Sequence, residues 1–572
     1  MSLDDVIHNE IGGFGPWQQF IAFGAGLAIL PSNLFLSTFP TFVPKFRCQV
    51  DACDNQPFPD YRASWTQYGM PSSVFKQGVN VSHCVMFQYI GNGTTCTPAD
   101  FNDQILNECT TCVYDRSVFQ YSLVTSFDIG PCSNLDPACT PGNYVSKIAL
   151  LDLSYWVGVM FGGCVIGRIG DFLGGRKTII LSSILFSLTS VFLGSADTYW
   201  GFTILSFTAG LFALSSHTLA FIYLSEVVGQ DFVHLTPVIE IFQIAGSCLH
   251  GVVAYSSQNW RLIWWYAAFM NALILPIWMI LHESPRWLLS RGWYDEFQRV
   301  MKVAAKCNGV QLYPGSLEKA KKSKKTVTDC FWLLRNVNKK KKKQSYFFSS
   351  PLIWKNLLLM CLVWMSTSSI VFGVVRFSIV LEGDIYANYF MISISSLMGV
   401  GICVVCLKRQ SRKMTLIFFL VFGSLSLMLG ILVRDRNILL ALMIVAKIST
   451  SVAMFCCYVL TCELFPGSIR NSALGSSSAV GRVGALLSSL LISSKCLSMS
   501  TTIGVLVVFG LGSSSILALF LTDSMAYKLF ESLEDVQALE AKSTPLALSR
   551  EHSNEKIRLI DGYKNWDQMD DH

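Results

Sequence analysis

The stretch GRIGDFLGGRK at residues 167–177 lies between two long apolar segments, near residues 148–168 and 178–195. Its glycines permit a tight turn. Its acidic residue, Asp171, and its three basic residues favour water over the interior of a bilayer. We therefore interpret residues 167–177 as a short polar connection between two membrane-spanning helices.

A related connection occurs later in the chain, at residues 408–413, again between two apolar segments. Lys413 in this connection lies 237 residues after Arg176. Glu463 lies 237 residues after Glu226, and each of these two acids follows an apolar segment. Two unrelated pairs with one offset predict two six-helix halves of similar architecture around a central substrate site.

Apolar segments of this kind recur along the whole 572-residue chain. About half of the residues (52%) are hydrophobic, 14% are charged, and the mean hydropathy is +0.44, which is too apolar for a soluble protein of this length. A helix of ~20 apolar residues spans a bilayer core. We predict an all-α polytopic membrane protein with twelve transmembrane helices, near residues 17–39, 148–168, 178–195, 200–222, 235–257, 261–281, 357–380, 386–407, 414–433, 438–462, 471–494 and 500–522.

Basic residues gather in connections that follow even-numbered helices. Residues 282–355 hold 17 Lys or Arg and 5 Asp or Glu, including five consecutive lysines at 339–343. The positive-inside rule places these connections, and with them both termini, in the cytoplasm. The lysine run could contact nucleic acid, but beside a membrane we favour a solvated or lipid-contacting segment and expect no nucleic acid partner.

The predicted organisation follows from these assignments. The acidic first residues lack the positive charge of a signal peptide, so the first apolar segment is interpreted as a retained helix. We predict a cytoplasmic N-terminus (1–16), a first six-helix half (17–281) that contains an extracellular loop (45–147), a basic cytoplasmic loop (282–355), a second six-helix half (356–522) and a cytoplasmic tail (523–572).

The extracellular loop is rich in cysteine and carries two N-glycosylation sequons, at Asn80 and Asn92. An even number of cysteines in an oxidising compartment predicts disulfides. A zinc or redox site is the alternative for the Cys-x-x-Cys pair, but no His/Cys set at zinc spacing accompanies it. The disulfide candidates are Cys48, Cys53, Cys84, Cys96, Cys109, Cys112, Cys132 and Cys139.

Several motifs together resemble the major facilitator superfamily and, within it, the organic cation/anion/zwitterion transporter family, which includes organic ion and carnitine transporters. Besides the Cys-rich loop and residues 167–177, the motifs are Trp260-Arg261, Glu283 to Leu288, Glu463 to Pro466, Arg470-Asn471 and Arg482 to Gly484. The resemblance covers nearly the whole chain. It implies a transporter with two helical halves and a central cavity in the plasma membrane.

Arg482 is the strongest candidate for substrate contact. It lies between Gly481 and Gly484 in an apolar span, where a charge normally faces a cavity or a partner. A guanidinium can hold a carboxylate by two parallel hydrogen bonds. In the resembled family, an arginine at this position accompanies anions and zwitterions. The alternative is a buried ion pair, with Glu240 as a possible partner.

Other intramembrane residues are weaker candidates. Lys447 could bind an anion or pair with an acid, and Arg376 could reach the outer interface from its span. The histidines at 217 and 250 fit packed, hydrogen-bonded side chains better than proton carriers. Aromatic rings offer apolar area and cation–π faces, and we include Tyr458, Trp364 and Phe372 in the predicted substrate site, together with Glu240.

A separate set of charges flanks the helices on the cytoplasmic side and repeats between the halves. We predict that they form salt bridges that hold the halves together on that side and break during transport. The alternative is that they only orient the helices. The predicted gating residues are Asp171, Arg176, Glu226, Glu283, Arg286, Arg412, Lys413, Glu463 and Arg470.

These observations favour a uniporter or exchanger of small organic ions that works by alternating access, with carnitine-like zwitterions or anions favoured and organic cations possible. A transporter-like receptor or non-transporting pseudo-carrier is the alternative, because several family positions differ here. No P-loop, nucleophile elbow or HExxH motif is present, so we expect no enzyme activity, no cofactor and no metal. The expected partners are the organic ion and the lipid bilayer.

Overall fold

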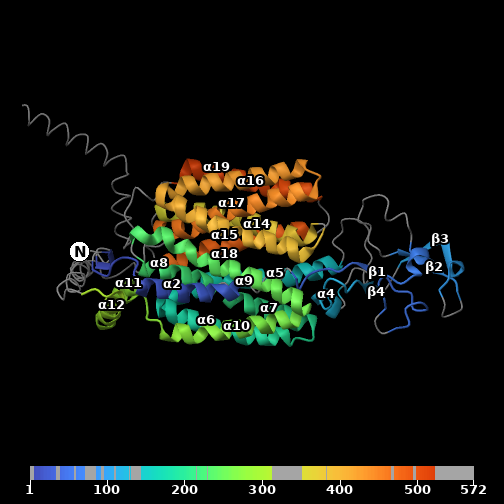
Figure 1. Ribbon diagram of the computed structural model, residues 1–572, viewed down its shortest axis with the longest axis horizontal. Coiled ribbons are helices and arrows are strands. Elements are labelled where there is room, and N and C mark those ends of the chain that lie inside the picture. The colour runs from blue at the N-terminus through green and yellow to red at the C-terminus, as the bar shows by residue number, and fades with distance from the viewer. Residues whose placement is uncertain are drawn as a thin grey trace, which may run out of the picture.

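Helices dominate the computed structural model (Figure 1). It describes residues 6–8, 10–33, 39–56, 59–70, 85–91, 96–108, 111–127, 129, 143–213, 215–228, 230–311, 351–381, 383–465, 469–493 and 498–521. Within these ranges, eleven helical stretches are long and apolar enough to cross a membrane. They match the second to twelfth predicted spans and confirm the predicted fold.

The first half begins with a shorter helix. α2 (Pro16–Ile29) continues into a 3-10 turn, η1 (Leu30–Asn33), while residues 34–38 of the first predicted span lie outside the described residues. The remaining elements of this half are α5 (Asn143–Leu173), α6 (Gly175–Gly194), α7 (Tyr199–Ala213), α8 (Ser215–Val227), η5 (Gln230–Ile239), α9 (Glu240–Ser257) and α10 (Trp260–Ile280).

The second half contains α14 (Pro351–Val380), α15 (Ile385–Arg409), α16 (Arg412–Leu432), α17 (Arg436–Leu464), α18 (Arg470–Ser493) and α19 (Met499–Phe520). Polar side chains that accept hydrogen bonds from the free N–H groups of the first turn mark several helix starts. Asp384, Ser411, Asp435 and Ser498 act in this way for α15, α16, α17 and α19. The polar connections therefore specify where the apolar helices begin.

The two halves lie side by side in the bundle, with α2 to α10 on one side and α14 to α19 on the other (Figure 1). α5 packs against α18, and α9 packs against α15. These two contacts join the halves, so any space between them is lined by residues from both parts of the chain.

One end of the bundle, here called the α12 end, carries two short helices that the sequence did not predict: α11 (Pro285–Arg291) and α12 (Tyr294–Asn308). Asn308 joins α12 to the start of α2. Its side chain accepts a hydrogen bond from the Trp17 backbone N–H (2.8 Å) and donates to the Ile11 carbonyl (2.8 Å) and to Gln18 (3.0 Å). The predicted loop 282–355 is thus partly helical and attached to the first helix.

The opposite end, here called the β end, carries two small antiparallel sheets (Figure 1). β1 (Phe46–Cys48) pairs with β4 (Cys112–Tyr114), and β2 (Val85–Tyr89) pairs with β3 (Phe101–Glu108). These strands are an addition to the all-α fold class predicted from the sequence.

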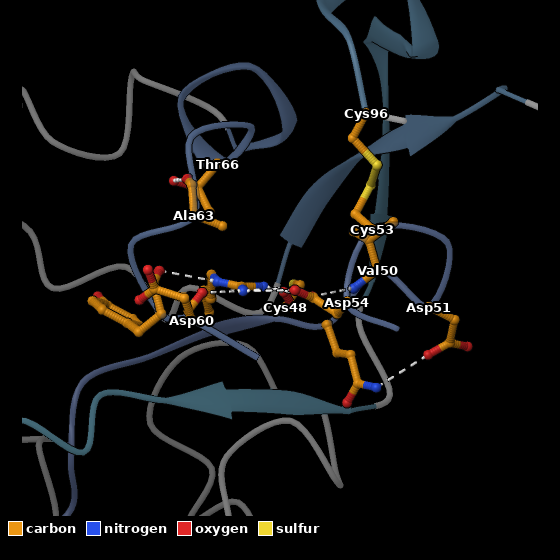
Figure 2. A network of polar contacts seen from close by, with 12 residues as sticks. Cys48, Val50, Asp51, Cys53, Asp54, Asp60, Ala63, Thr66 and Cys96 are labelled. Atoms are coloured by element: carbon orange, nitrogen blue, oxygen red, sulfur yellow. Dashed lines mark hydrogen bonds and ion pairs between the residues drawn. A yellow bond between two sulfur atoms is a disulfide. The ribbon is translucent and has the colours of Figure 1, made fainter. Parts of the chain in front are cut away.

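A buried arginine organises the loop that contains these strands. Arg47 donates two parallel hydrogen bonds to Asp54 (2.7 and 2.8 Å), and its other N–H groups reach the carbonyls of Cys48, Asp60 and Tyr61. Figure 2 shows this network beside the disulfide between Cys53 and Cys96. All five guanidinium donors are used, which compensates for the burial of the charge.

The structure describes half of the eight cysteines predicted to form disulfides. Cys53 and Cys96 are bonded to each other, and Cys48 and Cys112 each take part in a disulfide. The predicted sequons and the other four cysteines lie outside the described residues: Asn80, Asn92, Cys84, Cys109, Cys132 and Cys139.

Candidate functional site

A cavity of about 60 Å³ lies between the two halves. The first half contributes three residues of α9: Gln243, Ile244 and Ser247. The second half contributes the rest of the lining from α14, α15, α17 and α18: Val371, Phe372, Val375, Tyr389, Ser393, Ser396, Lys447, Ser451, Met454, Phe455, Tyr458 and Arg482. The cavity is therefore apolar, aromatic and hydroxyl-rich, with two basic side chains.

The two basic residues are both buried in the membrane-spanning part. Arg482 on α18 is 2% exposed and Lys447 on α17 is 7% exposed. Within the described residues, neither forms an ion pair, and the cavity lining contains no carboxylate. A buried positive charge is costly unless it is compensated. The cavity thus has the electrostatic character of an anion site.

Phe372 on α14 positions the guanidinium of Arg482. The Arg482 Cζ atom lies 5.4 Å from the centre of the Phe372 ring, within cation–π distance. Trp156 of α5 packs edge-on against the same ring, with centroids 5.3 Å apart. One aromatic side chain of the second half is therefore held between the cation and the first half.

Tyr458 and Trp364, predicted as substrate residues, occupy different layers. Tyr458 lines the cavity. Trp364 packs behind it, edge to face at 4.6 Å, and donates its indole N–H to the Thr461 hydroxyl at 3.1 Å. Trp364 is not part of the cavity lining, so its place in the structure is that of a support for Tyr458.

Glu240 pairs with His217 in this structure. The His217 Nε2 and Glu240 Oε1 atoms are 3.0 Å apart, and the two side chains are 1% and 0% exposed. Glu240 is the first residue of α9, directly after the 3-10 helix η5, and it is not part of the cavity lining. The alternative expectation that Glu240 pairs with Arg482 is not met here, which leaves Arg482 open to another negative group.

On the β-end side of the cavity, a buried ion pair joins the halves. Arg376 of α14 lies 3.4 Å from Asp152 of α5 and also donates to the Thr41 hydroxyl at 3.1 Å. Asp152 additionally accepts a hydrogen bond from Ser489 of α18 at 3.1 Å. Arg376 therefore binds the opposite half, whereas the sequence alone suggested that it reaches the lipid interface.

On the α12-end side of the cavity, the halves contact each other through the side chain of Asp171 and through the close packing of α5 against α18. Asp171 accepts hydrogen bonds from the Ser472 backbone N–H (3.2 Å) and from the Ser472 hydroxyl. Nearby, a β-carbon at Gly167 would lie only 2.9 Å from the Asn471 carbonyl oxygen, and Gly163 faces Gly475 in the same way. Glycine is required here because the backbones of α5 and α18 nearly touch.

The repeated basic residues have matching structural roles within their own halves. Arg176 donates to the carbonyls of Trp278 (3.1 Å) and Met279 (2.6 Å) at the end of α10. Lys413 donates to the carbonyls of Ala518 (2.9 Å) and Leu521 (2.6 Å) at the end of α19. Cations stabilise the free carbonyls of a helix C-terminus. This shared role gives a physical reason for the 237-residue spacing.

Most of the other predicted gating residues also contact their own half. Arg412 lies 3.3 Å from Glu463, Arg286 donates to the Glu226 carbonyl at 3.1 Å, and Arg470 donates to the Cys462 carbonyl at 2.9 Å. Asp171 differs, because its hydrogen bonds with Ser472 cross between the halves. The gating role of the whole set stays a prediction.

Glu283 lies at the α12 end, between α10 and α11. Its carboxylate accepts hydrogen bonds from the backbone N–H groups of Arg176 (3.1 Å) and Ser284 (3.3 Å). Burial raises the pKa of Glu283, against the opposing effect of these two donors. The acid thus ties the α6 start to the α10 end within the first half.

The sequence did not predict two polar pairs: His217 with Glu240, and Arg376 with Asp152. Each member is a charged or titratable residue in an apolar span, so the sequence does show that each needs a polar partner. It does not show which residues pair, because the partners are separated by 23 and 224 residues.

Comparisons with known proteins agree with this architecture. The family model described as Major Facilitator Superfamily matches residues 141–408. Mouse "Solute carrier family 22 member 21" is 24% identical over 96% of each chain, and human "Organic cation/carnitine transporter 2" is 25% identical over 85% of each chain. The Drosophila melanogaster "Organic cation transporter protein" is 25% identical over 97% of this chain and 98% of its own length.

Among solved structures, the proton:xylose symporter XylE bound to 6-bromo-6-deoxy-D-glucose superposes with a TM-score of 0.57. It covers 73% of this chain and 93% of its own, at 16% sequence identity, so the likeness concerns the fold alone. The paired helical halves thus have the major facilitator fold, and the chain is similar in sequence to the Major Facilitator Superfamily over residues 141–408 and to organic cation and carnitine transporters over most of its length.

Proposed function

We propose that this protein carries small organic ions across a membrane and that anions or zwitterions are its favoured substrates. The observation that carries the proposal is the central cavity, which holds Arg482 and Lys447 but no carboxylate. Both cations are buried, so a bound negative group would replace missing hydration and form charge-assisted hydrogen bonds. The surrounding rings would cover the apolar part of such a substrate.

Alternating access fits the contacts on the two sides of the cavity. Arg376 with Asp152 joins the halves toward the β end, and Asp171 with Ser472 joins them toward the α12 end. In our mechanism, one set breaks while the other persists, so the cavity opens to one side at a time. The cavity is small in this conformation, and the halves would separate further to admit a substrate.

Organic cations are the second candidate substrates. Aromatic side chains line the cavity at Phe372, Tyr389, Phe455 and Tyr458, and such rings can bind cations. The relatives are named as transporters of organic cations or of organic cations and carnitine. These names do not favour the alternative of a receptor or pseudo-carrier, and they support transport without covalent chemistry.

For the topology, we propose a plasma membrane location with the β end outside and both termini in the cytoplasm. The disulfide between Cys53 and Cys96 and the basic composition of residues 282–355 support this orientation. Removal of N-glycans from the cell-surface protein should lower its apparent mass, and joint substitution of Asn80 and Asn92 by Gln should abolish that shift. A persistent shift in the double variant would contradict the sequon assignment.

The transport proposal is tested by uptake of four labelled probes into proteoliposomes: p-aminohippurate, L-carnitine, urate and tetraethylammonium. We expect saturable uptake of one or more of the first three, above that of protein-free vesicles. Uptake of tetraethylammonium alone would favour the cation alternative. Saturable binding without accumulation or exchange of any probe would favour the receptor alternative.

A further inference from the structure

We propose that His217 and Glu240 form a proton-binding site and that the protein carries a proton together with each carboxylate substrate. This inference rests on the function proposed above. It assigns a coupling ion to the carrier and a location for it beside, but outside, the substrate cavity.

The pair is built as a buried site. The His217 Nε2 and Glu240 Oε1 atoms are 3.0 Å apart, and both side chains are almost fully buried. Within the described residues, His217 Nδ1 and Glu240 Oε2 are buried without a hydrogen-bond partner. A proton can therefore be added to the pair or removed from it without breaking any other hydrogen bond. Acid and histidine side chains inside membranes commonly carry protons in this way.

Tyr458 connects the pair to the substrate cavity. Its ring stacks on His217, with centroids 5.3 Å apart and an interplanar angle of 21°. The same side chain lines the cavity together with Arg482. One aromatic ring thus separates the proposed proton site from the proposed carboxylate site.

Arg482 and Lys447, the two buried cations of the cavity lining, are the positive charges that can respond to the pair. In the described part of the chain, His217 forms no ion pair other than that with Glu240. α2 and η1 contribute no acidic or basic residue. The packed helices carry further titratable or charged groups, which include Arg436, Lys447, Cys456, Cys457, Tyr458, Cys462 and Glu463 on α17, Tyr386, Tyr389, Cys403, Cys406, Lys408 and Arg409 on α15, Cys248, His250 and Tyr255 on α9, Tyr223 and Glu226 on α8, and His234 on η5.

Charged groups on further packed elements are engaged elsewhere. Asp152 binds Arg376, Asp171 binds Ser472, and Arg176 caps α10. Arg261 on α10 pairs with Asp197, and Arg286 and Arg291 on α11 donate to backbone carbonyls. None of these contacts involves the histidine–glutamate pair.

Charge balance then couples the two ligands. When the histidine is neutral and the glutamate is ionised, the pair carries a charge of −1 and lowers the net positive charge of the region that contains Arg482 and Lys447. A carboxylate bound to Arg482 adds a further charge of −1, and this added negative charge favours uptake of a proton by the pair. Because an uncompensated buried charge is costly, each ligand strengthens the binding of the other. The proton comes from water on the side where the carboxylate enters and returns to water on the side where it leaves.

The test uses proteoliposomes that contain a trapped pH-sensitive dye. External p-aminohippurate, a carboxylate with a net charge of −1, is added, and internal acidification is recorded together with uptake of the labelled probe. We expect about one proton to enter with each p-aminohippurate, because the pair takes up one proton as the negative charge binds, and an inward proton gradient to drive accumulation. The matched variants are Glu240→Gln, which mimics the protonated acid, and His250→Gln, which removes another buried histidine on the same helix.

Glu240→Gln should lose proton influx and gradient-driven accumulation but retain carboxylate exchange, while His250→Gln should keep the wild-type ratio of protons to carboxylate whatever its rate. Carboxylate uptake by the wild-type protein without proton influx would overturn this inference and leave the transport proposal standing. Retained proton influx in Glu240→Gln would also overturn it. No uptake of any probe by the wild-type protein would overturn both. The wild-type flux ratio is decisive even if a variant fails to fold.

Discussion

Replacing Arg482 by lysine tests the carboxylate site while keeping its charge. The guanidinium can form two parallel N–H···O bonds with a carboxylate, whereas an ammonium acts as a point donor. Arg482 is only 2% exposed, so water has little access to replace a lost hydrogen bond. One hydrogen bond to a charged group contributes about 1.5–3 kcal/mol. Its loss corresponds to a roughly 10- to 150-fold higher half-saturation concentration.

The assay measures initial uptake of the transported carboxylate at several concentrations, normalised to the amount of protein in the membrane. Arg482→Lys should raise the half-saturation concentration by that factor. Arg482→Asp should abolish carboxylate uptake and is expected to admit a cation such as tetraethylammonium. Arg299→Lys is the matched control, because Arg299 lies on α12, is 73% exposed and is far along the chain from the cavity helices.

Two results would refute this reasoning. Unchanged half-saturation in a well-incorporated Arg482→Lys variant would show that the arginine does not hold the carboxylate by two bonds. Unchanged carboxylate uptake by Arg482→Asp would exclude direct contact altogether. A comparable loss in Arg299→Lys would show that the effect comes from arginine replacement in general rather than from the cavity.

Further predictions concern the contacts between the halves. Arg376→Ala or Asp152→Ala leaves a buried charge unpaired and should destabilise the protein by about 3–5 kcal/mol. Thermal unfolding in detergent measures this loss, and an unchanged unfolding temperature would contradict the pairing. Ser472→Ala removes a hydroxyl donor from the α12-end contact and should widen the distance between spin labels on α5 and α18 at that end, whereas an unchanged distance distribution would count against a closing role. Gly167→Ala should slow transport, because the added methyl group prevents the close contact between α5 and α18. Gly512→Ala is the control, because Gly512 faces open space. Equal effects of the two substitutions on the transport rate would argue against a role for the close contact of α5 with α18.

The sequence predicted the membrane helices well because hydropathy is a local property. Long uncharged segments appear directly in the chain, and eleven of the predicted spans match helices of the structure within several residues. α11 and α12 were missed although α12 carries a signal. Its buried residues Phe297, Val300, Met301 and Ala304 follow helical spacing, and Asp295 and Glu296 occupy its first turn. The strongly basic composition of residues 282–355 obscured this short amphipathic pattern.

The candidate site was only partly predictable. Arg482 and Lys447 could be named because a charge inside an apolar span needs compensation. Their surroundings depend on which helices pack together, and that information is tertiary. For the same reason, Glu240 could be proposed as a partner of Arg482, whereas the packing of α8 against the α9 region selects His217.

The antiparallel pair formed by α5 and α18 has a mechanical consequence. Asp152 and Asp171 lie 19 positions apart on α5, roughly 28 Å at 1.5 Å per residue. They face Ser489 and Ser472, which lie at opposite ends of α18. If both helices are rigid, a tilt of α5 against α18 that separates one pair of ends brings the opposite pair of ends together. Both ends can separate at once only if one of the helices bends. The stiffness of α5 and α18 therefore prevents a continuous open pore.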